Sequence, residues 1–295
     1  MRLLVRELRG MSEEDFLESR SRLEENYRDF EYEYCAGRAR ADWTMLVDFA
    51  GRVVADLGCG YGSVSLPLAE RGAKLVVSVD ATLERLGFLA NLARMRGIRN
   101  VVPIHGDVTA LPLAAGSIDL VVMVGLLEYA CNFFPSQRLS GHQKQIAFLR
   151  SLRKVLREGG EIWVGIENRL SPIHFLGASY HHELPFTPLL PRFAANTLTR
   201  WVRGTNLNAY LSSARGYRRL LEAAGFRAVC VHHAYPDYKL PKLITTRPDR
   251  PFFATHVAPH AGTTTLRIAV SVLQTLAAVG LGGVFSPAFF LQARK

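Results

Sequence analysis

The stretch "VVADLGCGYG", residues 53–62, decides the fold. An apolar run ends in an acid, Asp56, and glycines then occupy every second position, at Gly58, Gly60 and Gly62. A strand followed by a glycine-rich turn into a helix is typical of an open α/β sheet, in which ligands bind beyond the carboxyl ends of the strands. We therefore expect a ligand that needs bare backbone and a negative charge at the same place.

Apolar strands alternate with amphipathic helices along most of the chain. This pattern predicts an α/β fold with a doubly wound, mostly parallel sheet that helices cover on both faces. We expect seven strands, at 53–56, 74–80, 100–107, 117–125, 161–168, 227–235 and 288–295. We expect helices at 63–71, 82–97, 142–160 and 215–226.

The domain organisation follows from where this alternation stops. Residues 1–50 are predicted to form a helical N-terminal cap, and residues 51–295 the ligand-binding domain. Two stretches, at about 171–214 and 236–284, have no clean period. We interpret both as insertions on one sheet rather than as separate domains.

The net charge of +10 is unevenly distributed. Residues 1–170 hold 22 basic and 22 acidic residues, whereas residues 171–295 hold 14 basic and only 4 acidic ones. The excess is either a solvated basic surface or a field that attracts an anionic acceptor, such as a phosphate, a lipid head group or a nucleic acid.

The sequence favours a cytoplasmic location. Its four cysteines are scattered without a CxxC pair, and the N-terminus has too short an apolar run for a signal peptide. The apolar stretch 265–291 is interrupted by Arg267, Gln274 and Pro287. We interpret residues 266–279 as an amphipathic helix, which leaves peripheral association with a membrane surface open.

Three acids at successive strand ends indicate the kind of ligand. Asp80 follows Gly58 by 22 residues, a spacing at which a carboxylate accepts hydrogen bonds from ribose hydroxyls, and Asp107 ends the next strand. A pyrophosphate beside Asp56 would be repelled by several kcal/mol at ~4 Å in a partly buried site. S-adenosylmethionine (SAM) carries a sulfonium and an ammonium and no phosphate, so it suits these acids better than a dinucleotide.

The sequence resembles the class I SAM-dependent methyltransferases. The motifs that carry the resemblance are "VVADLGCGYG", "VVSVD" (76–80), "IHGDVTALPLAAGSIDLVVMVGLLEY" (104–129) and "LREGGEIWVGIEN" (156–168). The resemblance implies SAM as the cofactor and a transferase activity. The cofactor-binding residues that it implies are Asp56, Gly58, Gly60, Tyr61, Asp80, Ala81, Asp107, Val108, Gly125 and Leu126, with Tyr27 and Tyr34 as further candidates to close over the cofactor.

The segment after the fifth strand bears on the acceptor. "ENRLSPIHFLGASYHHELPF" (167–186) is similar to a segment of bacterial methyltransferases that act on glycans or their lipid carriers. Glu167, Asn168, Gly177 and His182 match that segment, whereas Tyr180 and His181 replace its Glu-Asp pair.

His182 is the preferred candidate for a general base, because a histidine titrates near neutral pH. Glu167 and Glu128 are further catalytic candidates. No metal site is predicted, because adjacent residues such as His181 and His182 point in different directions.

The sequence favours O-methylation of an anionic, glycosylated or lipid-linked acceptor. Three alternatives stay open: methylation of a small secondary metabolite, methylation of RNA, and a SAM-fold scaffold without catalysis. RNA is disfavoured because the chain has no appended RNA-binding module and no RNA-typical catalytic motif.

Overall fold

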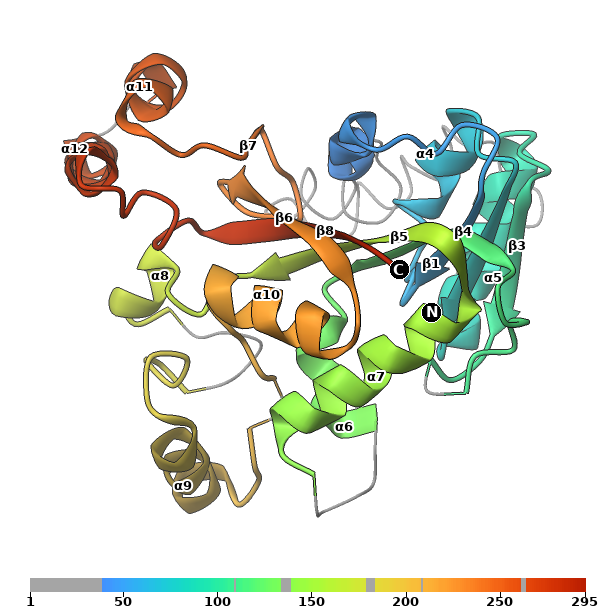
Figure 1. Cartoon of the computed structure of the whole chain (residues 1–295), viewed down its shortest axis with the longest axis horizontal. Coiled ribbons are helices and arrows are strands. Elements are labelled where there is room, and N and C mark those ends of the chain that lie inside the picture. Colours follow the sequence, from blue (N-terminus) through green and yellow to red (C-terminus); the bar gives the residue numbers. More distant parts are fainter. Residues whose placement is uncertain (1–38, 109, 134–138, 179–183, 208, 261–263) are drawn as a thin grey trace, which may run out of the picture.

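The computed structural model describes residues 39–108, 110–133, 139–178, 184–207, 209–260 and 264–295. These residues form one eight-stranded sheet in the order β3-β2-β1-β4-β5-β8-β6-β7, with helices packed around it (Figure 1). The strands are β1 (Val53–Leu57), β2 (Leu75–Asp80), β3 (Val101–His105), β4 (Ile118–Val124), β5 (Leu156–Glu167), β6 (Arg227–Tyr235), β7 (Leu243–Thr245) and β8 (Ala288–Arg294).

The sheet is parallel from β3 to β5, and β8 lies antiparallel between β5 and β6. The predicted mostly parallel α/β sheet is therefore confirmed. The prediction of seven strands is wrong, because β7 pairs antiparallel with β6 and adds an eighth strand at the edge. A strand of three residues is too short to produce a readable apolar period.

Helices occupy most of the remaining described chain. Those that cover the sheet or lie at its carboxyl edge are η1 (Ala39–Leu46), α4 (Ser65–Glu70), α5 (Leu83–Met95), η2 (Leu127–Tyr129), α6 (Ala130–Phe133), α7 (Gly141–Val155) and α10 (Ala214–Ala223). Those in the two expected insertions are α8 (Pro172–Phe175), α9 (Arg192–Arg203), α11 (Arg250–Phe252), η3 (Phe253–Val257), η4 (Ala258–His260) and α12 (Thr264–Ala278).

Strand β4 explains why both faces of the sheet are covered. Successive side chains of a strand point to opposite faces. Val121 and Met123 belong to one buried cluster, and Leu120 and Val122 belong to another. Because every residue of this stretch is apolar, each face needs its own apolar cover.

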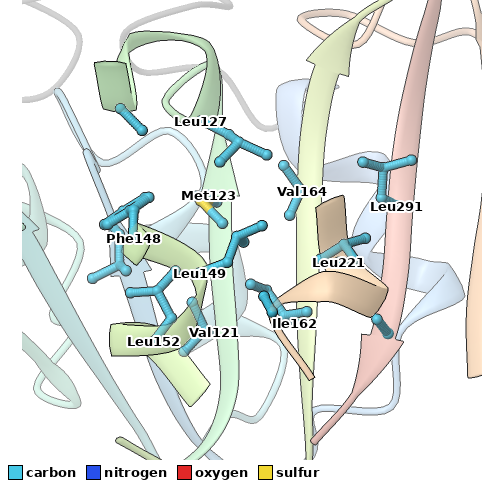
Figure 2. Packing of buried hydrophobic residues seen from close by; sticks show 14 of the residues in the cluster. Val121, Met123, Leu127, Phe148, Leu149, Leu152, Ile162, Val164, Leu221 and Leu291 are labelled. Carbon is cyan, nitrogen blue, oxygen red and sulfur yellow. The ribbon is translucent and has the colours of Figure 1, made fainter. Parts of the chain in front are cut away.

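Two sets of helices supply that cover. On one face, Phe148, Leu149 and Leu152 of α7 pack with the strands, and Leu221 of α10 joins the same cluster (Figure 2). On the other face, Trp43 of η1 stacks on Phe290 of β8 with ring centroids 4.8 Å apart. The sheet is thereby held rigid, which fixes the positions of the loops at its carboxyl edge.

The expected element boundaries differ at the entry to β5. The helix α7 ends at Val155, and Leu156 already pairs with Ile118, so the strand begins five residues earlier than the sequence indicates. Gly159, with φ of +74°, and Gly160 lie within an irregular part of the ladder rather than at a helix end.

The two expected insertions lie beyond the carboxyl ends of β5 and β6. The first contains α9, an amphipathic helix where no clean period was recognised. Pro191 precedes this helix, and Gly204 ends it with φ of +72°, so its boundary signals were present in the sequence. Among the described helices, none is long and apolar enough to cross a membrane. Of the expected N-terminal cap, only residues from 39 onward are described.

Candidate active site

The glycine turn after β1 is shaped by left-handed backbone. The backbone φ angles of Gly58, Gly60 and Gly62 are +66°, +56° and +87°. Residues other than glycine rarely adopt such positive φ angles. The amide of Gly58 donates to the carbonyl of Val79 on β2 at 2.8 Å, which anchors the turn to the sheet. An added Cβ at Gly60 would meet nothing within 4 Å, so its backbone faces open space.

This open space is a cavity of about 540 Å³ at the carboxyl edge of β1, β2 and β4. Its size lies within the range of about 300–1,000 Å³ that is typical of small-molecule sites. The residues that line it are Arg40, Gly58, Cys59, Gly60, Tyr61, Ser63, Asp80, Ala81, Thr82, Arg85, Asp107, Val108, Val124, Gly125, Leu126, Tyr129, Asn132 and Phe133. Nine of the ten predicted cofactor residues are among them, and Asp56 is the exception.

Asp80 joins the glycine turn to the next strand. One carboxylate oxygen accepts a hydrogen bond from the amide of Gly60 at 2.9 Å, and the other accepts from the amide of Thr82 at 2.9 Å. Each carboxylate oxygen has further lone-pair capacity. The side chain therefore holds the turn in shape and presents acceptors to a ligand's hydroxyl groups.

Asp56 lies beneath the turn rather than on the cavity wall. It accepts a hydrogen bond from the hydroxyl of Ser65 at 2.6 Å, and the hydroxyl of Ser78 donates to that of Ser65 at 2.8 Å. Burial raises the pKa of Asp56 to about 6, and the positive charge of Arg40 partly opposes this rise. The role of Asp56 in binding the cofactor stays a prediction, since this carboxyl does not line the cavity and instead contacts Ser65 at the start of α4.

Arg40 is a cavity residue that sequence reasoning missed. It comes from η1, lines the same cavity as Gly58 and Asp80, and is 7% exposed. Nothing in the sequence distinguishes it from the neighbouring Arg38, because η1 lies outside the recognised motifs. Its guanidinium gives the cavity a cation in addition to the acids Asp80 and Asp107.

Comparisons with known proteins agree with this geometry. Residues 54–160 match the family model described as a methyltransferase domain. Within these residues the chain carries a methyltransferase domain, in keeping with its resemblance to the class I SAM-dependent methyltransferases. A putative S-adenosylmethionine-dependent methyltransferase from Listeria monocytogenes shares the fold, with a TM-score of 0.50, 14% identity, and coverage of 87% of this chain and 97% of the other.

Two similar curated relatives cover less of the chain. A ubiquinone biosynthesis O-methyltransferase of Xanthomonas oryzae is 29% identical over 57% of this chain and 64% of its own length. A cypemycin N-terminal methyltransferase of Streptomyces is 37% identical over 37% of this chain and 40% of its own length. The chain thus spans less than two thirds of the length of either relative. The resemblance to glycan and lipid-carrier enzymes gains no support from them and stays a prediction.

The cavity fits SAM, the cofactor of the class I family. Gly60 offers open backbone, Asp80 offers acceptors for ribose hydroxyls, and Arg40 offers a cation for the carboxylate of the methionine part. Asp107 and Val108, which the sequence predicts to contact the adenine, also line the cavity. Tyr61 packs edge-on against Phe88 with ring centroids 5.2 Å apart, which holds its ring at the cavity.

The predicted catalytic residues do not gather at this cavity within the described structure. His182 lies outside the described residues, as do Tyr27 and Tyr34. Glu167 ends β5 in a nearly buried position, and Lys239 contacts it in an ion pair of 3.3 Å. Glu128 is fully buried on η2. Neither glutamate lines the cofactor cavity.

Both glutamates lie near Tyr217 on α10. The hydroxyl of Tyr217 donates to the backbone carbonyl of Glu167 at 3.0 Å. Burial raises the pKa of Tyr217 well above its usual value, and the negative charges of Glu128 and Glu167 raise it further. Tyr129, Asn132 and Phe133, which follow β4, reach the cavity instead of Glu128.

Proposed function

We propose that the protein transfers the methyl group of SAM to an oxygen of an anionic, polar acceptor. The observation that carries the proposal is the cavity at the carboxyl edge, which nine of the residues implied by the family motifs line together. When bound, SAM supplies a methyl group already activated by positive sulfur. The chain's own contribution is to hold both reactants in line and to exclude water.

The backbone that follows β4 is expected to position the two reactants, because packed side chains hold it in place. Gly125 and Leu126 follow β4 on the cavity wall, at the predicted place of the transferring methyl. Gly125 has φ of +73°, and an added Cβ would lie 2.9 Å from the hydroxyl of Tyr238. The packed Tyr238 ring therefore supports the backbone at the point where the acceptor is expected to approach.

One of the two relatives supports oxygen as the methylated atom, and neither fixes the acceptor. One is named for O-methylation in ubiquinone biosynthesis, and the other for methylation of a peptide N-terminus. They match only 57% and 37% of this chain, so they inform only part of it. Methylation of a small metabolite or a peptide amine is the alternative.

We also propose that the acceptor is met at an anionic lipid surface. The insertions expose large apolar side chains, among them Leu176 on the α8 side, Phe193 and Trp201 on α9, and Val279 after α12. The two insertions together hold eight basic and three acidic residues, so their charge complements anionic head groups. Exposed tryptophan and arginine side chains favour the boundary between water and lipid.

The proposal that the cavity binds SAM is tested by calorimetry. We expect SAM and S-adenosylhomocysteine to bind the full chain, and NAD, which carries a pyrophosphate, not to bind. Asp80→Ala removes both acceptors for the backbone amides and is expected to weaken SAM binding at least tenfold. Tight binding of NAD, or no binding of SAM, would contradict the assignment.

The proposed methyl transfer is tested with methyl-labelled SAM and cell-extract fractions. Label is expected in an acid-soluble or lipid fraction that binds to an anion-exchange resin. Asp80→Ala protein serves as the background control. Label confined to RNA or to peptide would favour one of the alternative acceptors.

A further inference from the structure

A second cavity, of about 470 Å³, lies between α6, the start of α7 and α9. These three elements lie on the same side of the sheet in Figure 1. The residues that line the cavity are Cys131, Asn132, Leu139, Ser140, Gly141, Lys144, Asn196, Arg200, Asn206, Leu207 and Tyr210. Its wall is therefore mostly polar, unlike an interior void left by imperfect packing.

The charged groups in this wall have one sign. Lys144 and Arg200 are cations, and no carboxylate is among the described residues that line the cavity. The ammonium of Lys144 donates to the carbonyl of Cys131 at 3.0 Å, and a guanidinium nitrogen of Arg200 donates to the side-chain oxygen of Asn206 at 2.7 Å. These bonds hold both cations at the wall, while an ammonium and a guanidinium carry further donors.

The backbone adds to the same field. α7 is a helix of 15 residues whose first turn lies in the wall, with Ser140 as its N-cap and Gln143 completing a capping box. The N-terminus of a helix carries a partial positive charge. The amide side chains of Asn196 and Asn206 add neutral hydrogen-bonding groups.

The second cavity adjoins the cofactor cavity through Asn132, which lines both. A ligand that fills it therefore lies next to the cofactor rather than on a remote surface. We infer that this cavity binds the phosphate-bearing, hydroxylated part of the acceptor. Lys144 and Arg200 hold the phosphate, and the asparagine amides contact hydroxyl groups. The inference rests on the proposed methyl transfer, because it treats the occupant as the acceptor.

The inference is tested with inorganic phosphate as the probe, titrated into the full chain saturated with S-adenosylhomocysteine at constant ionic strength. Binding is followed by calorimetry and by phosphorus NMR. We expect saturable binding in the wild type and at least tenfold weaker binding in Lys144→Met and in Arg200→Gln. Glucuronate, titrated in parallel, distinguishes a phosphate site from a site for any oxyanion.

Arg203→Gln is the matched control, because Arg203 is an exposed cation on the same helix that does not line the cavity. It is expected to keep the wild-type affinity for phosphate. No saturable phosphate binding in the wild type, or equal losses in Arg200→Gln and Arg203→Gln, would overturn the inference.

Binding of S-adenosylhomocysteine, measured for each variant, distinguishes a wrong phosphate site from a wrong proposed function. It is expected to be unchanged in all three variants, which also reports that they fold. If the wild type does not bind the cofactor product, the proposed function fails, and the phosphate titration of the unliganded chain still tests the anion site.

Discussion

Asp56 and Asp80 look alike in the sequence, since each ends an apolar strand, but their surroundings give them different roles. Asp80 accepts hydrogen bonds from the amides of Gly60 and Thr82 and lines the cavity. Asp56 contacts Ser65 and is almost completely buried. One carboxyl therefore lines the cavity, and the other supports the turn from a buried position, where burial disfavours its charged form.

The burial of Asp56 predicts a pH dependence of stability. Burial raises the pKa of Asp56 from 3.8 to about 6. Between these pH values the folded chain binds this proton more tightly than the unfolded chain does, so the free energy of unfolding falls as pH rises through the window. The loss approaches about 3 kcal/mol above pH 6, since one pKa unit is worth about 1.4 kcal/mol.

Asp56→Asn keeps the shape of the side chain and removes the titration. The stability of the wild type relative to this variant is expected to fall between pH 4 and pH 7, as measured by urea unfolding at four pH values. Asp42→Asn, which alters an exposed carboxylate paired with Arg71, is expected to change stability by less than about 1 kcal/mol. A pH-independent difference between wild type and Asp56→Asn would contradict the assignment.

Arg40 allows a second prediction at the scale of one residue. Arg40→Gln removes the cation that we expect to hold the carboxylate of the methionine part of SAM. A hydrogen bond to a charged group contributes about 1.5–3 kcal/mol. S-adenosylhomocysteine is therefore expected to bind 10- to 100-fold more weakly, as measured by calorimetry.

The ligand supplies the control for Arg40. Methylthioadenosine lacks the amino-acid part, so its affinity is expected to be equal in the wild type and in Arg40→Gln. Equal losses for both ligands would indicate that Arg40 acts by shaping the cavity instead. Arg40 also marks a limit of sequence reasoning, because only the fold brings η1 to the turn after β1.

At the scale of elements, Gly62 joins the glycine turn to the helix α5. A Cβ at this position would lie 2.2 Å from a methyl carbon of Leu89, a buried residue of α5. In the sequence, Gly62 is the third glycine of the turn, and it is not among the expected cofactor-binding residues. The structure gives it a packing role, since Gly62 does not line the cavity, whereas Gly58 and Gly60 do.

Gly62→Ala is therefore expected to lower stability by two effects. Left-handed backbone costs about 1–2 kcal/mol for a residue with a side chain. Overlap with Leu89 adds about 1–3 kcal/mol of overpacking. Gly97→Ala is the matched control, because Gly97 has φ of +67° and no atom lies within 4 Å of its added Cβ. Urea unfolding that gives the same loss for both variants would refute the packing role.

Elements were predictable where one local signal dominated. β2 and β4 are continuous apolar runs between turn residues, and both lie within a residue or two of their expected positions. β7 was missed because its three residues depend on pairing with β6, a tertiary contact. α9 was missed although its boundaries were readable, because Phe193, Trp201 and Val202 on its exposed side obscure the polar face.

At the scale of the whole molecule, the two insertions lie beyond the edge that holds the cofactor cavity. The cofactor cavity lies at the carboxyl edge of the sheet. The insertions, with eight basic and three acidic residues, carry half of the net charge of +10 and most of the exposed large apolar side chains. α9 links these properties, since Arg200 lines the second cavity and Trp201 is 84% exposed. In an acceptor that carries both a phosphate and a lipid tail, the phosphate would bind Arg200 in the second cavity, while Trp201 contacts the lipid surface.

This arrangement predicts binding to anionic membranes. The full chain is expected to sediment with vesicles of phosphatidylcholine containing 30% phosphatidylglycerol, and much less with phosphatidylcholine alone. Phe193 and Trp201, eight residues apart, share one face of α9. Phe193→Ser combined with Trp201→Ser removes two exposed apolar side chains, so binding is expected to fall at least fivefold.

Val102→Ser is the control, because Val102 is an exposed apolar residue on β3, at the opposite edge of the sheet from β7. It is expected to sediment as the wild type does. Salt at 0.5 M is expected to weaken wild-type binding, since head-group attraction is screened within about 4–5 Å at that ionic strength. Wild-type binding that is equal on neutral and anionic vesicles, or unchanged by the double substitution, would mean that the basic and apolar insertions serve the acceptor cavity alone.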